Sequence, residues 1–175
     1  LLAAGESVRC LVRENSQADF LVQRNIPIVQ GDLERPDSLV EALQGADALV
    51  SVSPIRFAPA LVAACQQAGV SRGVFLSSTW RFSKVRTPDV EAVFLGEEAV
   101  EASGMEATIL RPTMIYGPGN DRNLSRLRDY LGKRSILPIF GSGEHLVQPI
   151  YVTDVADVVV AALLRAGAVG QVYEV

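Results

Sequence analysis

The stretch from which the fold of this chain can be predicted is residues 107–119, A-T-I-L-R-P-T-M-I-Y-G-P-G. Its β-branched and aliphatic run at 108–110 is typical of a short, fully buried parallel strand. Arg111-Pro112 ends that strand, because proline has no N–H group to give to a sheet ladder. The segment 116–119 then predicts a compact turn whose glycines take positive φ. In open α/β sheets ligands bind where such strands end, so this stretch predicts a binding crevice.

Short apolar strands and helices with one apolar face alternate on either side of this stretch. We expect extended segments at 8–12, 26–29, 48–52, 74–76, 107–110, 147–152 and 172–175. We expect helices at 16–24, 36–44, 58–68, 89–102, 124–131 and 154–164. Strands and helices that alternate at this spacing indicate βαβ units, and therefore an α/β fold with a parallel sheet.

Length, charge and cysteine content exclude several classes of protein. With 175 residues, the chain has the length of one domain with a substantial core. Its formal net charge of −4 argues against a nucleic-acid partner, because phosphate backbones require clustered lysine and arginine. No apolar run approaches the roughly 20 residues that span a bilayer, so we expect no membrane span. Cys10 and Cys65 lie in apolar segments, which favours core thiols over a disulfide or a metal site. A soluble protein of the reducing cytoplasm is expected.

Six motifs occur in the order of a known superfamily. They are V-R-C-L-V-R at 8–13, G-D-L at 31–33, A-D-A-L-V-S-V at 46–52, V-F-L-S-S-T at 74–79, S-G-M-E-A-T-I-L-R-P-T-M-I-Y-G-P-G at 103–119 and Q-P-I-Y-V-T-D-V-A at 148–156. With these motifs the chain resembles the extended and atypical short-chain dehydrogenase/reductase superfamily over nearly its whole length. It is most similar to the Rossmann-fold accessory subunit of respiratory complex I with its bacterial homologues and to the NmrA-like group, relatives of the NAD-dependent epimerases and dehydratases. The resemblance implies a Rossmann-like, doubly wound parallel sheet that binds NAD(P)(H).

Two departures from the family limit what the resemblance implies. The first concerns the family's opening strand and its G-x-x-G-x-x-G turn, which holds the pyrophosphate at a helix N-terminus and would come just before Leu1. The fragments G-P-G at 117–119 and G-S-G at 141–143 do not replace it, because neither lies between the strand and helix of a first βαβ unit. The family's substrate-specifying part would come mostly after Val175. We therefore expect residues 1–175 to form a single NAD(P)-binding domain that lacks this first strand and glycine-rich loop and is incomplete at both ends.

The second departure concerns catalysis. In this family the usual proton donor is a tyrosine followed four residues later on a helix by a lysine, which lowers the pKa of the phenol. At the corresponding places this chain has Asp89 and Val93. Neither Lys84 nor Lys133 lies four residues after a tyrosine. We therefore expect the usual acid–base pair to be missing.

The resemblance also implies which residues meet the cofactor. They follow the ends of predicted strands and are Arg13, Asp32, Leu33, Ser53, Pro54, Ser77, Ser78, Pro112 and Thr113. Arg13 corresponds to the residue beside the adenosine ribose, where a base can pair with a 2′-phosphate, so we expect NADP, with NAD as the alternative. Pro112 and Thr113 are expected against the nicotinamide. Without the resemblance, Arg13 reads equally well as a solvated arginine, and Asp32 as a turn aspartate.

Two residues are candidates for catalysis. Thr79 takes the family's catalytic serine or threonine place, although without the tyrosine it can only hydrogen-bond a ligand. Tyr116 is the only tyrosine close to the expected nicotinamide, and its simpler interpretation is packing in the turn. His145 has no serine or cysteine partner at a motif spacing, which argues against a hydrolase triad. We expect Glu97 and Glu98 to form a solvated helix face.

Two functional hypotheses follow. The first is an NAD(P)(H)-binding protein with a structural, sensing or assembly role, acting with a protein partner or as a homo-oligomer. The second is an NAD(P)-dependent oxidoreductase with a quinone or carbonyl acceptor, or a nucleotide-sugar epimerase or dehydratase, with another proton donor. The missing Tyr/Lys pair favours the first.

Overall fold

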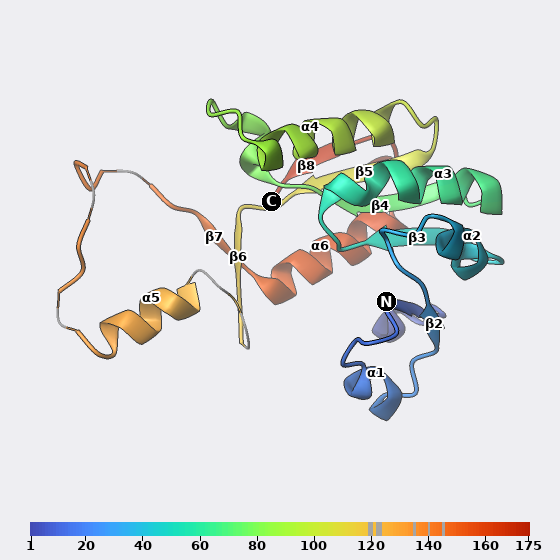
Figure 1. The fold of residues 1–175 in the computed structure, drawn as a ribbon, viewed down its shortest axis with the longest axis horizontal. Coiled ribbons are helices and arrows are strands. Elements are labelled where there is room, and N and C mark those ends of the chain that lie inside the picture. The colour runs from blue at the N-terminus through green and yellow to red at the C-terminus, as the bar shows by residue number, and fades with distance from the viewer. Residues whose placement is uncertain (119–120, 122–123, 135, 140, 145) are drawn as a thin grey trace.

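The computed structural model describes residues 1–118, 121, 124–134, 136–139, 141–144 and 146–175. Strands and helices alternate along these residues (Figure 1). The strands are β1 (Cys10–Val12), β2 (Ile28–Gln30), β3 (Ala48–Ser51), β4 (Arg72–Leu76), β5 (Glu106–Arg111), β6 (Met114–Tyr116), β7 (Pro149–Tyr151) and β8 (Val172–Glu174). The helices are α1 (Asp19–Gln23), α2 (Asp37–Leu43), α3 (Ala58–Ala68), α4 (Pro88–Glu101), α5 (Leu124–Leu131) and α6 (Val152–Leu164), with 3₁₀ turns η1 (Leu2–Ala4), η2 (Ile55–Phe57), η3 (Thr79–Phe82) and η4 (Ala166–Ala168). Gly119, the last residue of the predicted turn, and His145 lie outside the described residues.

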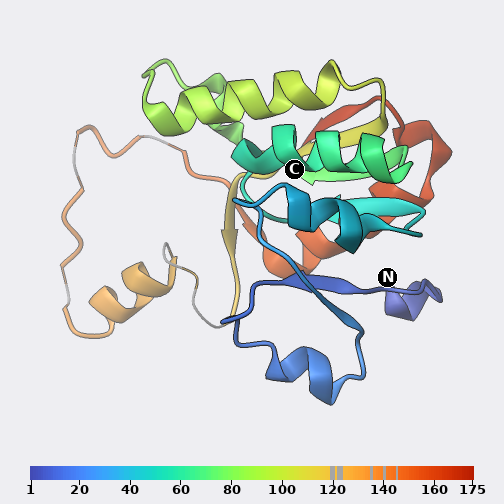
Figure 2. The same cartoon turned by 45° about the vertical axis from the view of Figure 1, so that its right-hand side comes forward.

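The strand pairs of the described residues are all parallel and form three separate sheets. The central sheet has the order β3-β4-β5-β8, while β1 pairs with β2 and β6 with β7. Helices α3 and α4 cover one face of the central sheet and α6 covers the other (Figures 1 and 2). The chain therefore has the predicted α/β fold with a doubly wound parallel sheet.

Alternate side chains of the central strands enter the two helical layers, because successive residues of a strand face opposite sides of a sheet. Phe75 and Ile109 belong to a buried cluster that includes residues of α2, α3 and α4. Val74 and Leu110 belong to a second cluster, with Val155 of α6. Since both faces are covered, the ends of the strands are the part of the sheet left for a ligand.

The structure differs from the sequence predictions in three local features. The helix predicted from residue 16 begins at Asp19, because Ser16 Oγ instead accepts a hydrogen bond from the N–H of Arg13 at 3.2 Å. Residues 114–116 form strand β6, which the sequence did not predict. Gly117 does not take the predicted positive φ. Its lack of a side chain makes room for Val152, whose Cγ1 would lie 2.5 Å from a Cβ at this position.

Both cysteines are free thiols, and the prediction of a core thiol is confirmed for Cys65, whereas Cys10 is only half-buried. Cys65 is fully buried in α3, and this burial raises the pKa of its thiol to about 11. The thiol is therefore protonated at neutral pH, which makes it a core side chain and not a nucleophile.

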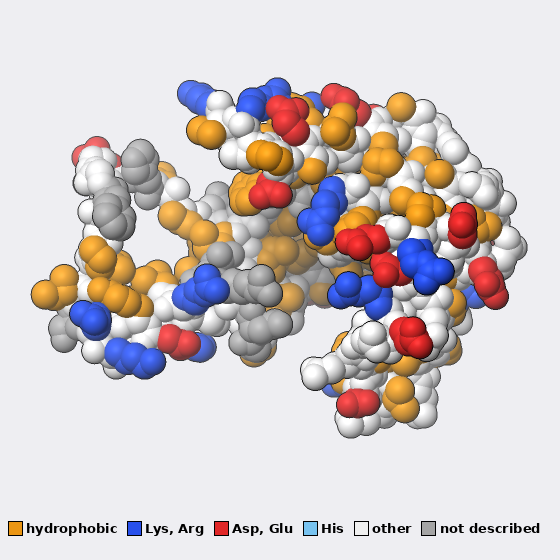
Figure 3. Space-filling model, viewed as in Figure 1, with side chains coloured by type: hydrophobic (Ala, Val, Ile, Leu, Met, Phe, Trp, Pro, Cys, Tyr) orange, Lys and Arg blue, Asp and Glu red, His pale blue; other side chains and the backbone are white. Residues whose placement is uncertain are grey.

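Acidic and basic side chains are mixed over the molecular face in Figure 3, while hydrophobic side chains gather around α5. In and after that helix, Leu131, Ile136 and Ile139 are 44%, 77% and 65% exposed. None of the helices within the described residues has the length and apolar character needed to cross a bilayer.

Candidate functional site

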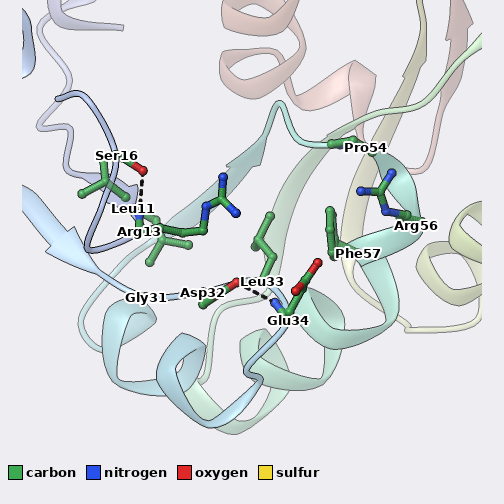
Figure 4. A pocket seen from close by; sticks show the side chains of 11 residues that line it. Leu11, Arg13, Ser16, Gly31, Asp32, Leu33, Glu34, Pro54, Arg56 and Phe57 are labelled. Carbon is green, nitrogen blue, oxygen red and sulfur yellow. Dashed lines mark hydrogen bonds between the residues drawn. The ribbon is translucent and has the colours of Figure 1, made fainter.

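A cavity of about 400 Å³ opens at the carboxyl ends of β1, β2 and β3 (Figure 4). Four of the residues predicted to meet a cofactor line it: Arg13, Asp32, Leu33 and Pro54. They follow three different strands, and the fold brings them into one place. Its lining combines apolar side chains with guanidinium and carboxylate groups, a mixture that suits a nucleoside.

The turn that follows β2 is fixed by local hydrogen bonds. The N–H of Asp32 donates to Ser38 Oγ at 2.9 Å, and Asp32 Oδ1 accepts the N–H of Glu34 at 3.0 Å. Gly31 allows this turn to approach β1, because a Cβ at that position would lie 2.6 Å from Leu11 Cδ1. The Asp32 carboxylate is therefore held in the wall of the cavity.

A second group of predicted residues lies at the carboxyl ends of β4 and β5. The N–H of Ser77 donates to the carbonyl of Leu110 at 2.7 Å, and the N–H of Thr79 donates to the carbonyl of Pro112 at 3.3 Å. Ser78 lies between the two donors in the chain. These bonds bring 77–79 alongside 112–113, although the segments are more than thirty residues apart in the sequence.

Thr113 has a feature that points to a ligand. Its Oγ1 is buried and has no hydrogen-bond partner among the described residues. Such an unpartnered hydroxyl costs about 1–3 kcal/mol, which a ligand with a donor or acceptor group would recover. The carboxamide of a nicotinamide offers both an N–H donor and a carbonyl acceptor. The hydroxyl at this strand end therefore fits a nicotinamide dinucleotide.

Glu97 of α4 is buried against the ends of β4 and β5, with only 1% of its surface exposed. Its carboxylate accepts hydrogen bonds from Arg111 Nε at 2.9 Å and Nη2 at 2.6 Å. It also accepts bonds from Arg81 Nε at 3.1 Å and from Ser77 Oγ. The prediction of a solvated carboxylate is thus wrong for Glu97, although Glu98 is exposed as predicted. This cluster fixes α4 to the strand ends beside the second group.

In this cluster Glu97 and Arg111 each stabilise the charged form of the other. Burial by itself raises the pKa of Glu97, but hydrogen bonds from Arg111 and Ser77 outweigh burial and hold this pKa below its ordinary value. The hydrogen bond to Glu97 raises the pKa of Arg111. The Ser77 hydroxyl donates its hydrogen to the Glu97 carboxylate. Its orientation is therefore fixed, and this hydrogen is not available to a ligand.

A signal for Glu97 was present in the sequence. Val90, Val93, Glu97 and Val100 follow one another at intervals of three or four residues, and all four are buried. A charged residue within an apolar helical stripe needs a partner once it is buried. The stripe indicates that Glu97 needs a cationic partner but does not say which one, and in the fold that partner is Arg111.

The two positions of this chain that correspond to the family's catalytic tyrosine and lysine lie on α4. Asp89 is exposed in the first turn of this helix, and Val93 packs in the cluster beneath it. Val93 carries no ionisable group, and its side chain contributes to the core instead of to a ligand site. Helix α4 therefore has a packing role at this position.

The two candidate catalytic hydroxyls have no hydrogen bond within the part of the chain that the structure describes. Tyr116 packs against Tyr151, with ring centroids 5.2 Å apart and planes inclined at 56°. This tilted arrangement is one that aromatic pairs favour, and it joins β6 to β7. Thr79 begins η3 directly after Ser78.

The fold does not gather all the predicted residues at one point. The cavity holds the first group, and the ends of β4 and β5 hold the second. Ser53 belongs to neither, because its Oγ shares a hydrogen bond of 2.8 Å with Ser51 Oγ at the end of β3. Among the described residues, no three histidine, cysteine, aspartate or glutamate side chains are grouped as metal ligands would be.

A family model described as NAD(P)H-binding matches residues 1–166. The chain belongs to this NAD(P)H-binding family. The match agrees with the extended and atypical short-chain dehydrogenase/reductase superfamily that the sequence motifs indicate.

Two curated relatives with different activities in their names are similar to this chain. The chain is 43% identical over 79 residues to NADH dehydrogenase [ubiquinone] 1 alpha subcomplex subunit 9, mitochondrial, of Arabidopsis thaliana, which covers 45% of this chain and 19% of that protein. It is 30% identical over 176 residues to the NAD(P)H azoreductase of Xenophilus azovorans, which covers 95% of this chain and 58% of that protein. The chain thus spans less than two thirds of the length of either relative.

A solved structure supports the fold. The NADPH-dependent quinone oxidoreductase QOR2 of Escherichia coli, complexed with NADPH, superposes with a TM-score of 0.78 at 22% sequence identity. The match covers 97% of this chain and 60% of that one. At this identity the similarity shows a shared Rossmann-like architecture.

Proposed function

We propose that this chain binds the adenosine half of a nicotinamide dinucleotide in the cavity at the ends of β1, β2 and β3. The observation that carries the proposal is the meeting of Arg13, Asp32, Leu33 and Pro54 around one cavity in a member of the NAD(P)H-binding family. The second group, which includes Ser77 and Ser78, then faces the nicotinamide half. There the unpartnered hydroxyl of Thr113 bonds the carboxamide, while Pro112 packs against the ring.

We propose NADP as the preferred cofactor. Arg13 ends the strand whose carboxyl end borders the cavity, and its guanidinium has no ion-pair partner among the described residues. A free guanidinium can bind the 2′-phosphate that distinguishes NADPH from NADH. Ser53 completes the turn after β3 and acts on the cofactor through the backbone position of Pro54.

The role that we favour is structural, sensing or assembly-related. In support, the helix that carries the Tyr/Lys pair in related enzymes has Asp89 and Val93, and Val93 is packed in the core. A relative that is a subunit of NADH dehydrogenase fits this role. The exposed apolar side chains around α5 suit a protein partner or a second copy of the chain.

The alternative is an oxidoreductase with a quinone or carbonyl acceptor. The similarity to an azoreductase over 95% of the chain favours it. Hydride would pass from the cofactor near Thr113, and Thr79 or Tyr116 would supply the proton. An epimerase or dehydratase remains a variant of this alternative.

One experiment separates the two roles. Full-length protein is titrated with NADPH and NADH by fluorescence, and NADPH oxidation is then followed with a quinone and an azo dye as acceptors. We expect binding with little turnover, because general acid catalysis that is worth 10²–10⁴-fold is missing. Robust turnover that Thr79→Ala or Tyr116→Phe abolishes would establish the enzyme. Failure to bind either cofactor would overturn the proposal as a whole.

A further inference from the structure

Two guanidinium groups frame the cavity from opposite sides. Arg13 follows β1, and Arg56 belongs to η2, which follows β3. Figure 4 shows both side chains beside the opening, with Leu33 and Phe57 between them. Neither guanidinium forms an ion pair within the described residues. Two unpaired cations at one concavity attract an anion more strongly than either would alone.

Arg56 is held in place by its surroundings. Its guanidinium carbon lies 4.5 Å from the centroid of the Phe57 ring, at cation–π distance. The backbone of η2 is closed by the N–H of Phe57, which donates to the carbonyl of Pro54 at 3.1 Å. Ile55 anchors the turn in the core with 4% of its surface exposed. The buried turn and the contact with the Phe57 ring therefore place the Arg56 guanidinium beside the cavity.

Within the described residues, the acidic groups of the cavity form no ion pair with these cations. Asp32 and Glu34 also line it, and Asp32 Oδ1 already accepts the N–H of Glu34. In the view of Figure 4 Asp32 and Glu34 lie on the opposite side of the opening from Pro54, with the Glu34 carboxylate beside the Phe57 ring. A ligand with a donor at one end and an anion at the other suits this arrangement. Adenosine with a phosphate on its ribose has such a distribution, since its exocyclic amine donates and its phosphate accepts.

We infer that Arg56 is a second cationic ligand for a phosphomonoester on the ribose of the bound nucleotide, acting together with Arg13. The inference rests on the proposed function and adds a specificity residue to it. Arg13 binds the phosphate from the end of β1, and Arg56 binds it from η2. The phosphate is the 2′-phosphate of NADPH, and the pyrophosphate that NADH also carries lies elsewhere.

The experiment measures affinity with probes that differ only in this phosphate. Full-length wild-type protein, Arg56→Ala and Arg56→Lys are titrated with NADPH, NADH, 2′-AMP and adenosine. Arg165→Ala is the matched control, because it removes the same charge from an exposed position at the end of α6. Circular dichroism establishes that each variant is folded.

We expect Arg56→Ala to weaken NADPH and 2′-AMP about tenfold or more and to change NADH and adenosine less than twofold. Arg56→Lys should recover part of the loss, and Arg165→Ala should match the wild type. Equal weakening of NADPH and NADH would overturn the inference and assign Arg56 to the pyrophosphate. Unchanged affinity for all probes would also overturn it while leaving dinucleotide binding intact. If wild-type protein binds neither dinucleotide, the proposed function itself fails.

Discussion

Arg13 is the residue that we expect to separate NADPH from NADH. Arg13→Ala should weaken NADPH binding about tenfold or more, because a hydrogen bond to a charged group contributes about 1.5–3 kcal/mol. NADH lacks the 2′-phosphate, so its affinity should change little. Fluorescence titration of both cofactors measures the ratio. Equal wild-type affinities for the two cofactors would contradict the assignment.

Glu97 makes the second prediction at this scale. Glu97→Gln keeps the shape of the side chain but leaves Arg111 and Arg81 without their counter-charge. Breaking a buried pair costs about 3–5 kcal/mol, and we expect about 3 kcal/mol because both arginines remain partly exposed. Urea unfolding measures the loss. Glu98→Gln, its exposed neighbour on the same helix, should stay within about 0.5 kcal/mol of wild type.

The same carboxylate predicts a pH dependence. The folded protein holds the pKa of Glu97 below its ordinary value, so the unfolded chain binds this proton more tightly. The stabilisation is therefore fully present above the ordinary glutamate pKa of about 4.3 and is lost as pH falls through the lower folded value. Between neutral and acidic pH, the free energy of unfolding should change less with pH for Glu97→Gln than for the wild type. If the free energy of unfolding depends on pH equally in both proteins, another group causes the loss of stability in acid.

At the scale of elements, α4 is pinned to η2 by Gly96. A Cβ on Gly96 would lie 2.3 Å from the carbonyl oxygen of Ile55, which is backbone and cannot turn aside. We expect Gly96→Ala to destabilise the protein by about 1–3 kcal/mol, even though alanine favours helices by about 1 kcal/mol.

Thermal and urea unfolding provide the measurement, with Gly167→Ala as the control. A Cβ on Gly167 would have no atom within 4 Å, and its φ is not in the left-handed region. The control should be neutral or slightly stabilising. If both substitutions behave alike, the close approach of α4 and η2 has no energetic weight.

At the scale of the whole molecule, the parallel strands that border the cavity belong to two separate sheets. Among the described residues no ladder joins β1 to β3, although the ends of both strands border one cavity. We propose that one more parallel strand pairs with both β1 and β3 and carries the glycine-rich turn that binds the pyrophosphate.

This proposal predicts a difference between two forms of the protein. The proposed turn supplies N–H groups and a helix end that compensate a desolvated pyrophosphate, so a form that carries it should bind NADPH at least tenfold more tightly than residues 1–175. Calorimetry on both forms makes the comparison. Equal NADPH affinities of residues 1–175 and of the longer form would contradict it.

The sequence alone was sufficient for the alternation of strands and helices. Helix α3 has the predicted bounds and ends at Gly69 in the left-handed conformation, since local signals of apolar spacing and a glycine cap determine where it lies. Helix α5 likewise has its predicted bounds. Arg13, Asp32, Leu33 and Pro54, which the family resemblance predicts to meet the cofactor, line one cavity, because parallel strands bring their carboxyl ends to one edge. Their contact with a cofactor stays a prediction.

Tertiary structure alone decided which side chains become partners across the sheet. Glu97 meets Arg111 and Ser77 only after α4 packs over the ends of β4 and β5, and spacing along one helix does not encode that meeting. Strand β6 exists because β7, more than thirty residues later, supplies its ladder. Arg56 and Arg13 line one cavity because the fold brings the carboxyl ends of β1 and β3 to the same edge. Local propensity places residues on elements, whereas burial, charge pairing and long-range ladders determine what those elements bring together.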